Sequence, residues 1–296
     1  METKHKRILV YDLETGGLEK SVNPITEFAG VIIDTSNLTI VKELSVMFKP
    51  RMDLSFINED SSKEAKMIFK KISYVDPDSS LTIVKYGNDI ILSQDKKKLI
   101  EPIDELKKFI EKRKQKYVFT YEEFLETKET KPELANILDI YMNVCYNPQA
   151  AELTHISRKM LLENGVEYED GFNQIKQLFL EATIEGSKPV IAGHNIRKFD
   201  NGCMELLFES NKFKFNSFID DFQIDTMDWA RLKWIELPNF TLGACSSELN
   251  IVLKGAHRAI NDTVANAELV IKFIENLRGL GNQVSKKVRK KFTLNI

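Results

Sequence analysis

Three short hydrophobic stretches open the chain, and each has the pattern of a β-strand. Ile8–Tyr11 is apolar and leads directly into Asp-Leu-Glu-Thr-Gly-Gly, which predicts a buried strand that ends in a glycine turn. Phe28–Ile33 is a second apolar run, and Leu38–Phe48 alternates between polar and apolar positions until Pro50. The pattern therefore predicts a three-stranded meander at the start of the chain.

From residue 151 onward, helical periodicity alternates with short apolar runs. Pro189–Ala192 is typical of a short buried strand, and Phe222–Lys233 of a strand that enters a helix. Strands first, followed by mixed strands and helices, predict an α/β sheet with helices on its faces. The predicted helices are Ile156–Asn164, Tyr168–Glu185, Asp200–Ser210, Thr241–Leu249 and Ala259–Leu277.

Residues 51–150 are dense in charge and interrupt this pattern. The alternating stretch Leu81–Leu92 is broken by Tyr-Gly-Asn-Asp, a typical hairpin turn, and helical patterns occupy Lys97–Lys114 and Lys131–Val144. We therefore expect one domain formed by residues 1–50 and 151–280, an inserted α+β module formed by residues 51–150, and a basic C-terminal tail over residues 281–296.

Composition excludes several classes of protein. The chain has 296 residues and a formal net charge of −2, which excludes a globally basic nucleic-acid coat protein. Its 3 cysteines form no Cys-x-x-Cys pair, which argues against a disulfide scaffold or a zinc ribbon and favours a reducing compartment. No apolar run is long enough to span a bilayer, and the apolar run near the first residue is shorter than a signal peptide needs, so we expect neither feature. We expect a soluble cytoplasmic protein without a membrane partner, with association with the nucleoid as an option.

Asp12 and Glu14 are the first indication of chemistry. They stand two residues apart at the end of a predicted strand, so both side chains leave the same face. Two carboxylates so close repel each other unless a cation lies between them, and oxygen ligands suit Mg²⁺ or Mn²⁺. The alternative is a solvated acidic turn.

Asp262 and Asp200 add two further carboxylates. Asp262 shares the apolar stripe of the helix Ala259–Leu277, where a carboxylate must be paired or bind a metal. The alternative is an aspartate that interacts with the helix dipole. Asp200 ends Gly-His-Asn-Ile-Arg-Lys-Phe-Asp after a predicted strand, and His257 lies in the loop before the last helix.

Three motifs in this order resemble the DEDDh branch of the DEDD 3′–5′ exonuclease superfamily. They are Asp12-x-Glu14-Thr15-Gly16, His194-Asn195-x3-Phe199-Asp200 and His257-x4-Asp262. The segment Thr26–Val31 and the spacing of the second motif are more similar to the exonuclease I type than to the proofreading epsilon type, although His194 stands where a tyrosine is usual. The resemblance covers about residues 1–50 and 151–280 and leaves out the insert.

The resemblance implies an RNase H-like fold with a mixed sheet of about five strands flanked by helices. It implies that Asp12, Glu14, Asp200 and Asp262 hold two Mg²⁺ ions, which Mn²⁺ can replace, and that His257 is the general base of a two-metal hydrolysis. The product would be a nucleoside 5′-monophosphate. The substrate-binding residues implied in this way are Thr15, Gly16, Gly17, Thr154, His155, Ser157, His194, Asn195 and Phe199.

Two of these residues have alternative roles: Asn195 would contact the scissile phosphate or brace the turn, and Phe199 would touch substrate or belong to the core.

The basic stretch Lys96–Lys116 holds nine Lys or Arg against four acidic residues. It is either a solvated helix face or an arm that follows phosphates, and Tyr117, Phe119 and Tyr121 after it would stack on bases or form the core of the module. The tail Lys286–Lys291 is a solvated or phosphate-binding end.

Single-stranded DNA with a free 3′ end is the substrate that we expect. The alternatives are the trimming of RNA 3′ ends by an exoribonuclease of the ribonuclease T type, and a proofreading or binding subunit that contacts a polymerase or another replication partner through residues 51–150.

Overall fold

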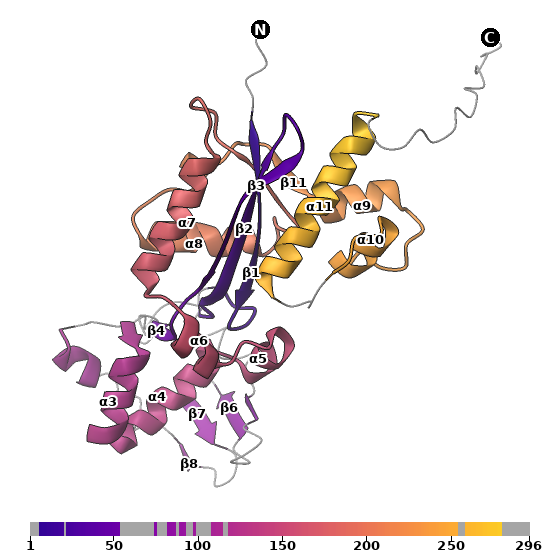
Figure 1. Cartoon of the computed structure of the whole chain (residues 1–296). Coiled ribbons are helices and arrows are strands. Elements are labelled where there is room, and N and C mark those ends of the chain that lie inside the picture. The colour runs from indigo at the N-terminus through magenta and orange to yellow at the C-terminus, as the bar shows by residue number, and fades with distance from the viewer. Residues whose placement is uncertain are drawn as a thin grey trace, which may run out of the picture.

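A mixed five-stranded sheet forms the centre of the molecule (Figure 1). The computed structural model describes residues 6–20, 22–53, 74–75, 82–86, 89–92, 97–98, 108–114, 118–253 and 258–279. β1 is antiparallel to β2 and parallel to β10, so the predicted mixed sheet is confirmed, and its first three strands form the predicted meander. The sheet order is β11 (Gln223–Asp225), β10 (Val190–Gly193), β1 (Arg7–Thr15), β2 (Ile25–Asp34) and β3 (Thr39–Met47).

Helices cover both faces of this sheet, and the alternation of side chains along β1 shows why (Figure 1). Leu9, Tyr11 and Leu13 lie in one core cluster with residues of α7 and α8, whereas Ile8 and Val10 lie in another with residues of α11. Because side chains alternate between the faces of a strand, Asp12 and Glu14 follow Ile8 and Val10 toward α11. The helices are α7 (Tyr168–Ala182), α8 (Asp200–Ser210), α9 (Thr226–Lys233), α10 (Leu242–Glu248) and α11 (Ala259–Leu277).

A second group of elements lies below the sheet in Figure 1. The predicted hairpin is confirmed, because β6 and β7 pair antiparallel around the expected turn. A buried cluster that includes Met52, Phe119 and Leu138 holds the helical part together. The elements are β4 (Arg51–Asp53), β5 (Tyr74–Val75), β6 (Thr82–Tyr86), β7 (Asp89–Leu92), β8 (Lys97–Lys98), β9 (Val118–Thr120), α3 (Tyr121–Thr130), α4 (Pro132–Cys145), α5 (Pro148–Thr154) and α6 (Arg158–Asn164).

The helix predicted over Lys97–Lys114 is wrong at its start. Lys97 pairs with Leu92, which makes Lys97–Lys98 a short strand, and helical structure is described only at residues 108–112. At Lys97–Lys98 the pairing with the neighbouring strand β7 determines the structure, although the sequence has a helical periodicity there. Phe119 is fully buried, so it belongs to the core and does not stack on bases.

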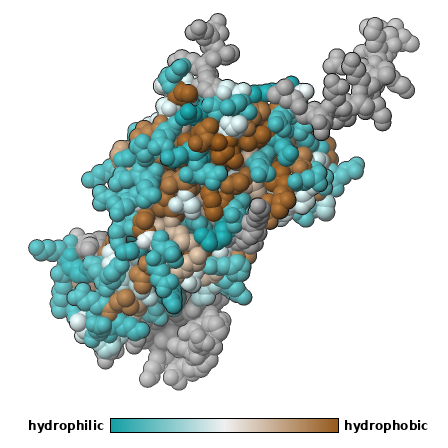
Figure 2. All heavy atoms as spheres, viewed as in Figure 1, coloured by the Kyte–Doolittle hydropathy of each residue, from teal (hydrophilic) through white to brown (hydrophobic). Residues whose placement is uncertain are grey.

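The buried cluster of the second group extends beyond the predicted insert. It also contains Met47 and Leu161, which lie outside residues 51–150, so this cluster does not mark the predicted domain boundaries, and these boundaries stay a prediction. Tyr117 and the basic tail lie outside the described residues. Within the described ranges, no helix has both the length and the hydrophobicity to cross a membrane. Hydrophilic residues cover most of the face seen in Figure 2, and hydrophobic ones gather over the sheet.

Candidate active site

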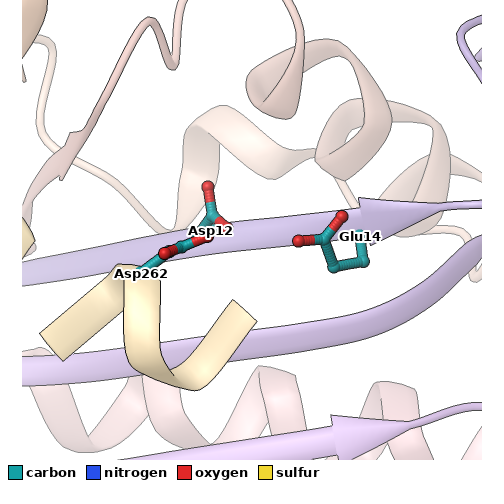
Figure 3. A group of neighbouring side chains, drawn as sticks. All are labelled: Asp12, Glu14 and Asp262. Atoms are coloured by element: carbon teal, nitrogen blue, oxygen red, sulfur yellow. The ribbon is translucent and has the colours of Figure 1, made fainter. Parts of the chain in front are cut away.

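Three carboxylates from two elements converge where β1 passes the first turn of α11. Asp12 and Glu14 project from β1, and Asp262 projects from α11 toward them (Figure 3). One carboxylate oxygen from each residue lies within 4.8 Å of the others. The two strand carboxylates, predicted to leave the same face of β1, thus lie next to the helix aspartate.

Asp200 stands beside this group without belonging to its closest set. It is the first residue of α8, directly after the turn that follows β10, and it is buried. The backbone groups of Asp200 itself and of Leu13 lie close enough to its carboxylate to lower its pKa, against the effect of burial. Since Leu13 lies between Asp12 and Glu14, this contact ties the start of α8 to the strand that carries the other two carboxylates.

The carboxylates hold protons more tightly than isolated ones do. Burial raises the pKa of Asp12 well above its usual value, and the charges of Asp200, Glu14 and Asp262 raise it further. Burial and the charges of Asp262, Glu27 and Asp200 raise the pKa of Glu14 to about 8, and burial raises that of Asp200 to about 7. Such a group of buried, ionised carboxylates is destabilising unless a cation binds to it, and hard oxygen donors of this kind suit Mg²⁺ or Mn²⁺. The residues therefore fit a divalent metal centre.

A pocket of about 250 Å³ opens beside the end of β1. Four of the predicted substrate-binding residues line it together: Thr15 and Gly16 at the end of β1, Thr154 at the end of α5, and Ser157 at the N-cap of α6. Thr26 also lines the pocket, and its buried hydroxyl oxygen has no hydrogen-bond partner. The pocket thus combines polar side chains with an unpartnered hydroxyl beside the end of the strand that carries Asp12 and Glu14.

The sequence also matches a known protein family. The family model RNase_T, described as exonuclease, matches residues 122–270, which is half of the chain. The chain belongs to this exonuclease family. The matched region includes Asp200 and Asp262 and begins after Asp12 and Glu14, so the first motif lies outside it. The predicted DEDDh 3′–5′ exonuclease, a hydrolase, is confirmed at the level of family and enzyme class.

Solved structures share the fold. Escherichia coli exonuclease I in complex with a dT13 oligonucleotide is 15% identical with a TM-score of 0.54, and the match covers 93% of this chain and 42% of that one. The zinc-bound E. coli exonuclease I complex with single-stranded DNA is 14% identical with a TM-score of 0.53, and the match covers the same shares of the two chains. Exonuclease I from Methylocaldum szegediense is 15% identical with a TM-score of 0.51, and the match covers 93% of this chain and 42% of that one. The exonuclease described here thus spans about two fifths of these chains. No curated protein sequence matches significantly.

Gly16 of the exonuclease has a role in packing that its motif did not predict. A Cβ at this position would lie 2.0 Å from the carbonyl oxygen of Cys145, at the end of α4. The backbone of Gly16 also accepts a hydrogen bond from the N–H of Asn147 at 2.7 Å. The glycine therefore lets the pocket turn touch the second group of helices. Thr15 donates to the carbonyl of Gly17 at 2.6 Å, which closes the same turn.

Other predicted substrate residues are spread around the pocket or engaged elsewhere. His155 is exposed and adopts a left-handed conformation after α5, next to the pocket residues Thr154 and Ser157. Asn195 is also left-handed, and its N–H donates to Asp225 at 2.9 Å, which favours the role of bracing the turn. Phe199 packs against the core while Lys20 lies over its ring, at 5.5 Å from the ring centroid.

His194, which was predicted to bind substrate, contacts two protein groups with its ring. Its Nε2 lies 2.7 Å from the carbonyl oxygen of Phe240, and its Nδ1 lies 3.0 Å from the hydroxyl of Thr226. Protein groups thus engage both ring nitrogens, and burial lowers the pKa of the imidazole. These contacts support a structural role for His194, which links β10 to α9 and to the segment before α10, in place of the predicted contact with substrate.

Sequence reasoning missed the pocket wall that the second group of helices supplies. Asn143, Asn147 and Arg158 line the pocket, and none of them belongs to a motif. Only the polar pair in Asn-x3-Asn at the end of a predicted helix could have indicated them. His257, the predicted general base, lies outside the described residues.

Proposed function

We propose that this protein is a metal-dependent exonuclease that removes nucleoside 5′-monophosphates from the 3′ end of single-stranded DNA. One observation carries the proposal: three carboxylates meet within 4.8 Å at the strand whose end lines a pocket, and four residues of that pocket are ones that the family resemblance had assigned to substrate. Solved exonuclease I structures of the same fold hold single-stranded oligonucleotides, which favours single-stranded DNA over duplex.

One set of residues would bind the metal ions, and another would bind the substrate. Asp12, Glu14, Asp200 and Asp262 would hold two Mg²⁺ ions, which supply Lewis-acid stabilisation of the charge that develops on the phosphate. Thr15, Gly16, Thr154 and Ser157 would bind and orient the terminal nucleotide. In the reaction, water attacks phosphorus, the bond to the 3′ oxygen of the neighbouring nucleotide breaks, and a 5′-monophosphate leaves.

His257 would take the proton of the attacking water. Its neighbour Arg258 is held against Glu27 by two N–H donors at 3.0 and 3.1 Å, so the chain is anchored one residue beyond the proposed base. A histidine beside carboxylates would receive a proton readily, because their negative charges would stabilise the imidazolium.

Digestion of matched substrates tests the proposal. Single-stranded DNA, duplex DNA and RNA, each labelled at the 5′ end, are incubated with Mg²⁺ or with chelator. Shortening of the single strand from its 3′ end with Mg²⁺ alone is the expected result, and Asp12→Asn and His257→Ala should both abolish it. Preferred shortening of RNA would assign the enzyme to RNA trimming. Binding without cleavage of any substrate would sink the exonuclease proposal and favour a binding subunit.

The insert keeps its predicted role as a proposal. Residues 51–150 would contact a polymerase or another replication partner, because they contain none of the four proposed metal ligands. Co-purification that survives high salt is the test, and it should be lost when these residues are replaced by a short linker.

A further inference from the structure

Glu27 is a fully buried carboxylate that the proposed reaction does not use. It lies on β2, directly opposite Glu14 on β1, with none of its surface exposed. A buried carboxylate is tolerated only when it is paired and hydrogen-bonded. In Glu27 both oxygens accept: Ser45 donates its hydroxyl at 3.2 Å, and Arg258 donates to one oxygen from Nη2 at 3.0 Å and to the other from Nε at 3.1 Å.

The partner, Arg258, stands at the start of α11. It directly follows His257 and is the N-cap residue of α11, where it makes no side-chain capping hydrogen bond of its own. The capping is supplied by Glu27, whose carboxylate accepts the N–H of Ala259 at 3.1 Å. A strand residue far away in sequence therefore fixes where α11 begins.

The position of Asp262 follows from this anchor. Its N–H donates to the carbonyl of Arg258 at 3.1 Å, in the first turn of α11. A shift of Arg258 would thus move Asp262 relative to Asp12 and Glu14. Arg258 also neutralises Glu27, which would otherwise add a fifth negative charge beside four carboxylates. A bidentate arginine resists rotation in a way that lysine cannot.

We propose that the Glu27–Arg258 ion pair is a positioning device of the active site: it holds the first turn of α11, and with it Asp262, in register with the carboxylates of β1. The inference rests on the proposed function. Neither residue touches substrate. The pair acts through Asp262, and it should affect turnover more than binding.

A set of variants with a matched control tests the pair. Arg258→Met removes the ion pair, Arg258→Lys keeps the charge without the bidentate contact, and Glu27→Gln/Arg258→Met removes both charges. The control is Arg278→Met, because Arg278 ties the opposite end of the same helix to the carbonyl of Thr35 at 2.9 Å. The readouts are kcat and KM on single-stranded DNA with Mg²⁺, the Kd for the same strand in chelator, Tm, and Mn²⁺ affinity by electron paramagnetic resonance.

Positioning predicts a loss of kcat without a loss of binding. Arg258→Met should lower kcat about 100-fold while Kd stays within about threefold, since small misplacements of catalytic groups cost about that much. Arg258→Lys should recover part of the loss, and the double variant should be no worse than Arg258→Met, because the two residues act as a unit. Arg278→Met should keep kcat within about twofold.

Two results would overturn the inference. One is an Arg258→Met enzyme whose Tm falls while kcat stays at the level of the control, which would make the pair purely structural. The other is a loss confined to Kd, which would make Arg258 a substrate contact. A wild-type protein without any hydrolysis would refute the proposed function alone. The Mn²⁺ titration then decides the inference: weaker binding in Arg258→Met than in Arg278→Met supports it, and equal binding refutes it.

Discussion

Glu14 on β1 lies directly opposite Glu27 on β2, but the two carboxylates have different surroundings. Glu27 is paired with Arg258, whereas Glu14 belongs to the acidic group with Asp12 and Asp262. Like charges opposite each other in a sheet are destabilising unless a cation compensates them. The pairing of Glu27 therefore leaves a cation requirement only on the Glu14 side, where the geometry suits a metal.

The metal-free protein should lose stability as the pH rises. Folding raises the pKa of Glu14 from 4.5 to about 8 and that of Asp200 from 3.8 to about 7. The unfolded chain therefore releases these protons at a lower pH than the folded protein does. Their contribution to the free energy of unfolding is constant below about pH 4 and decreases as the pH rises to about 8. We expect the Tm in chelator to fall across this interval.

Divalent ions should reverse this loss. Mg²⁺ or Mn²⁺ must displace protons from the carboxylates, so each should raise Tm more near pH 8 than near pH 5. Asp262→Asn, which removes one ligand, should reduce the increase, while Asp221→Asn in the loop before β11 should leave it unchanged. Differential scanning fluorimetry with and without chelator measures both effects. Equal increases at the two pH values would argue against binding by these carboxylates.

Gly16→Ala should damage both stability and activity. The added Cβ would meet the carbonyl oxygen of Cys145 at 2.0 Å, so the turn or α4 must move, at a cost of about 1–3 kcal/mol. Gly243→Ala in α10 is the control, because its Cβ would meet nothing closer than 3.8 Å and should stabilise the helix by up to about 1 kcal/mol. Urea unfolding followed by circular dichroism compares the two, and similar free energies would contradict the packing role of Gly16.

The sheet and the carboxylates could be predicted from the sequence because short-range patterns encode them. The alternation along β1 places Asp12 and Glu14 on one face, and the stripe of α11, whose bounds agree with the predicted Ala259–Leu277, turns Asp262 inward. Both features depend only on the periods of strand and helix. The glycine turn after β1 was predicted too, although its packing partner was not.

The long-range contacts could not be predicted in this way. The pair of Glu27 and Arg258 joins residues separated by 231 positions, and the pocket wall contributed by Asn143 and Asn147 depends on how the second group of helices docks. The contact of His194 with Phe240 could not be predicted for the same reason, since Phe240 lies 46 residues further along the chain. Side-chain pairing of this kind leaves no periodic trace in a single sequence.

His194→Leu should cost stability and leave substrate binding unchanged. A carbonyl oxygen only accepts, so Nε2 of His194 carries the proton that is donated to Phe240. Burial lowers the pKa of the ring, which keeps it neutral near pH 7. Loss of both hydrogen bonds should lower the free energy of unfolding by about 1–3 kcal/mol. His155→Asn is the contrast, because asparagine tolerates the left-handed backbone of exposed His155, so this change should alter KM and not stability. A raised KM in His194→Leu would restore the predicted substrate contact.

Arg158 provides a sharper test of the pocket. It lines the pocket at the start of α6, and its guanidinium pairs with Asp139 at 3.3 Å. If the pocket receives the phosphate of a single strand, Arg158→Met should weaken binding in chelator about tenfold and lower the slope of log Kd against log salt by about 0.7, the value for one lost phosphate contact. Turnover at saturating substrate should change little.

The neighbouring residue supplies the control for this variant. Lys159 has a side chain that is 82% exposed, pairs with Glu163 and does not line the pocket, so Lys159→Met removes the same charge from the same helix. Long-range attraction alone would weaken binding equally in both variants, because it depends on total charge. A difference confined to Arg158→Met, and lost as salt increases, would assign the phosphate to the pocket. Equal salt slopes would move the path of the strand away from Thr154 and Ser157.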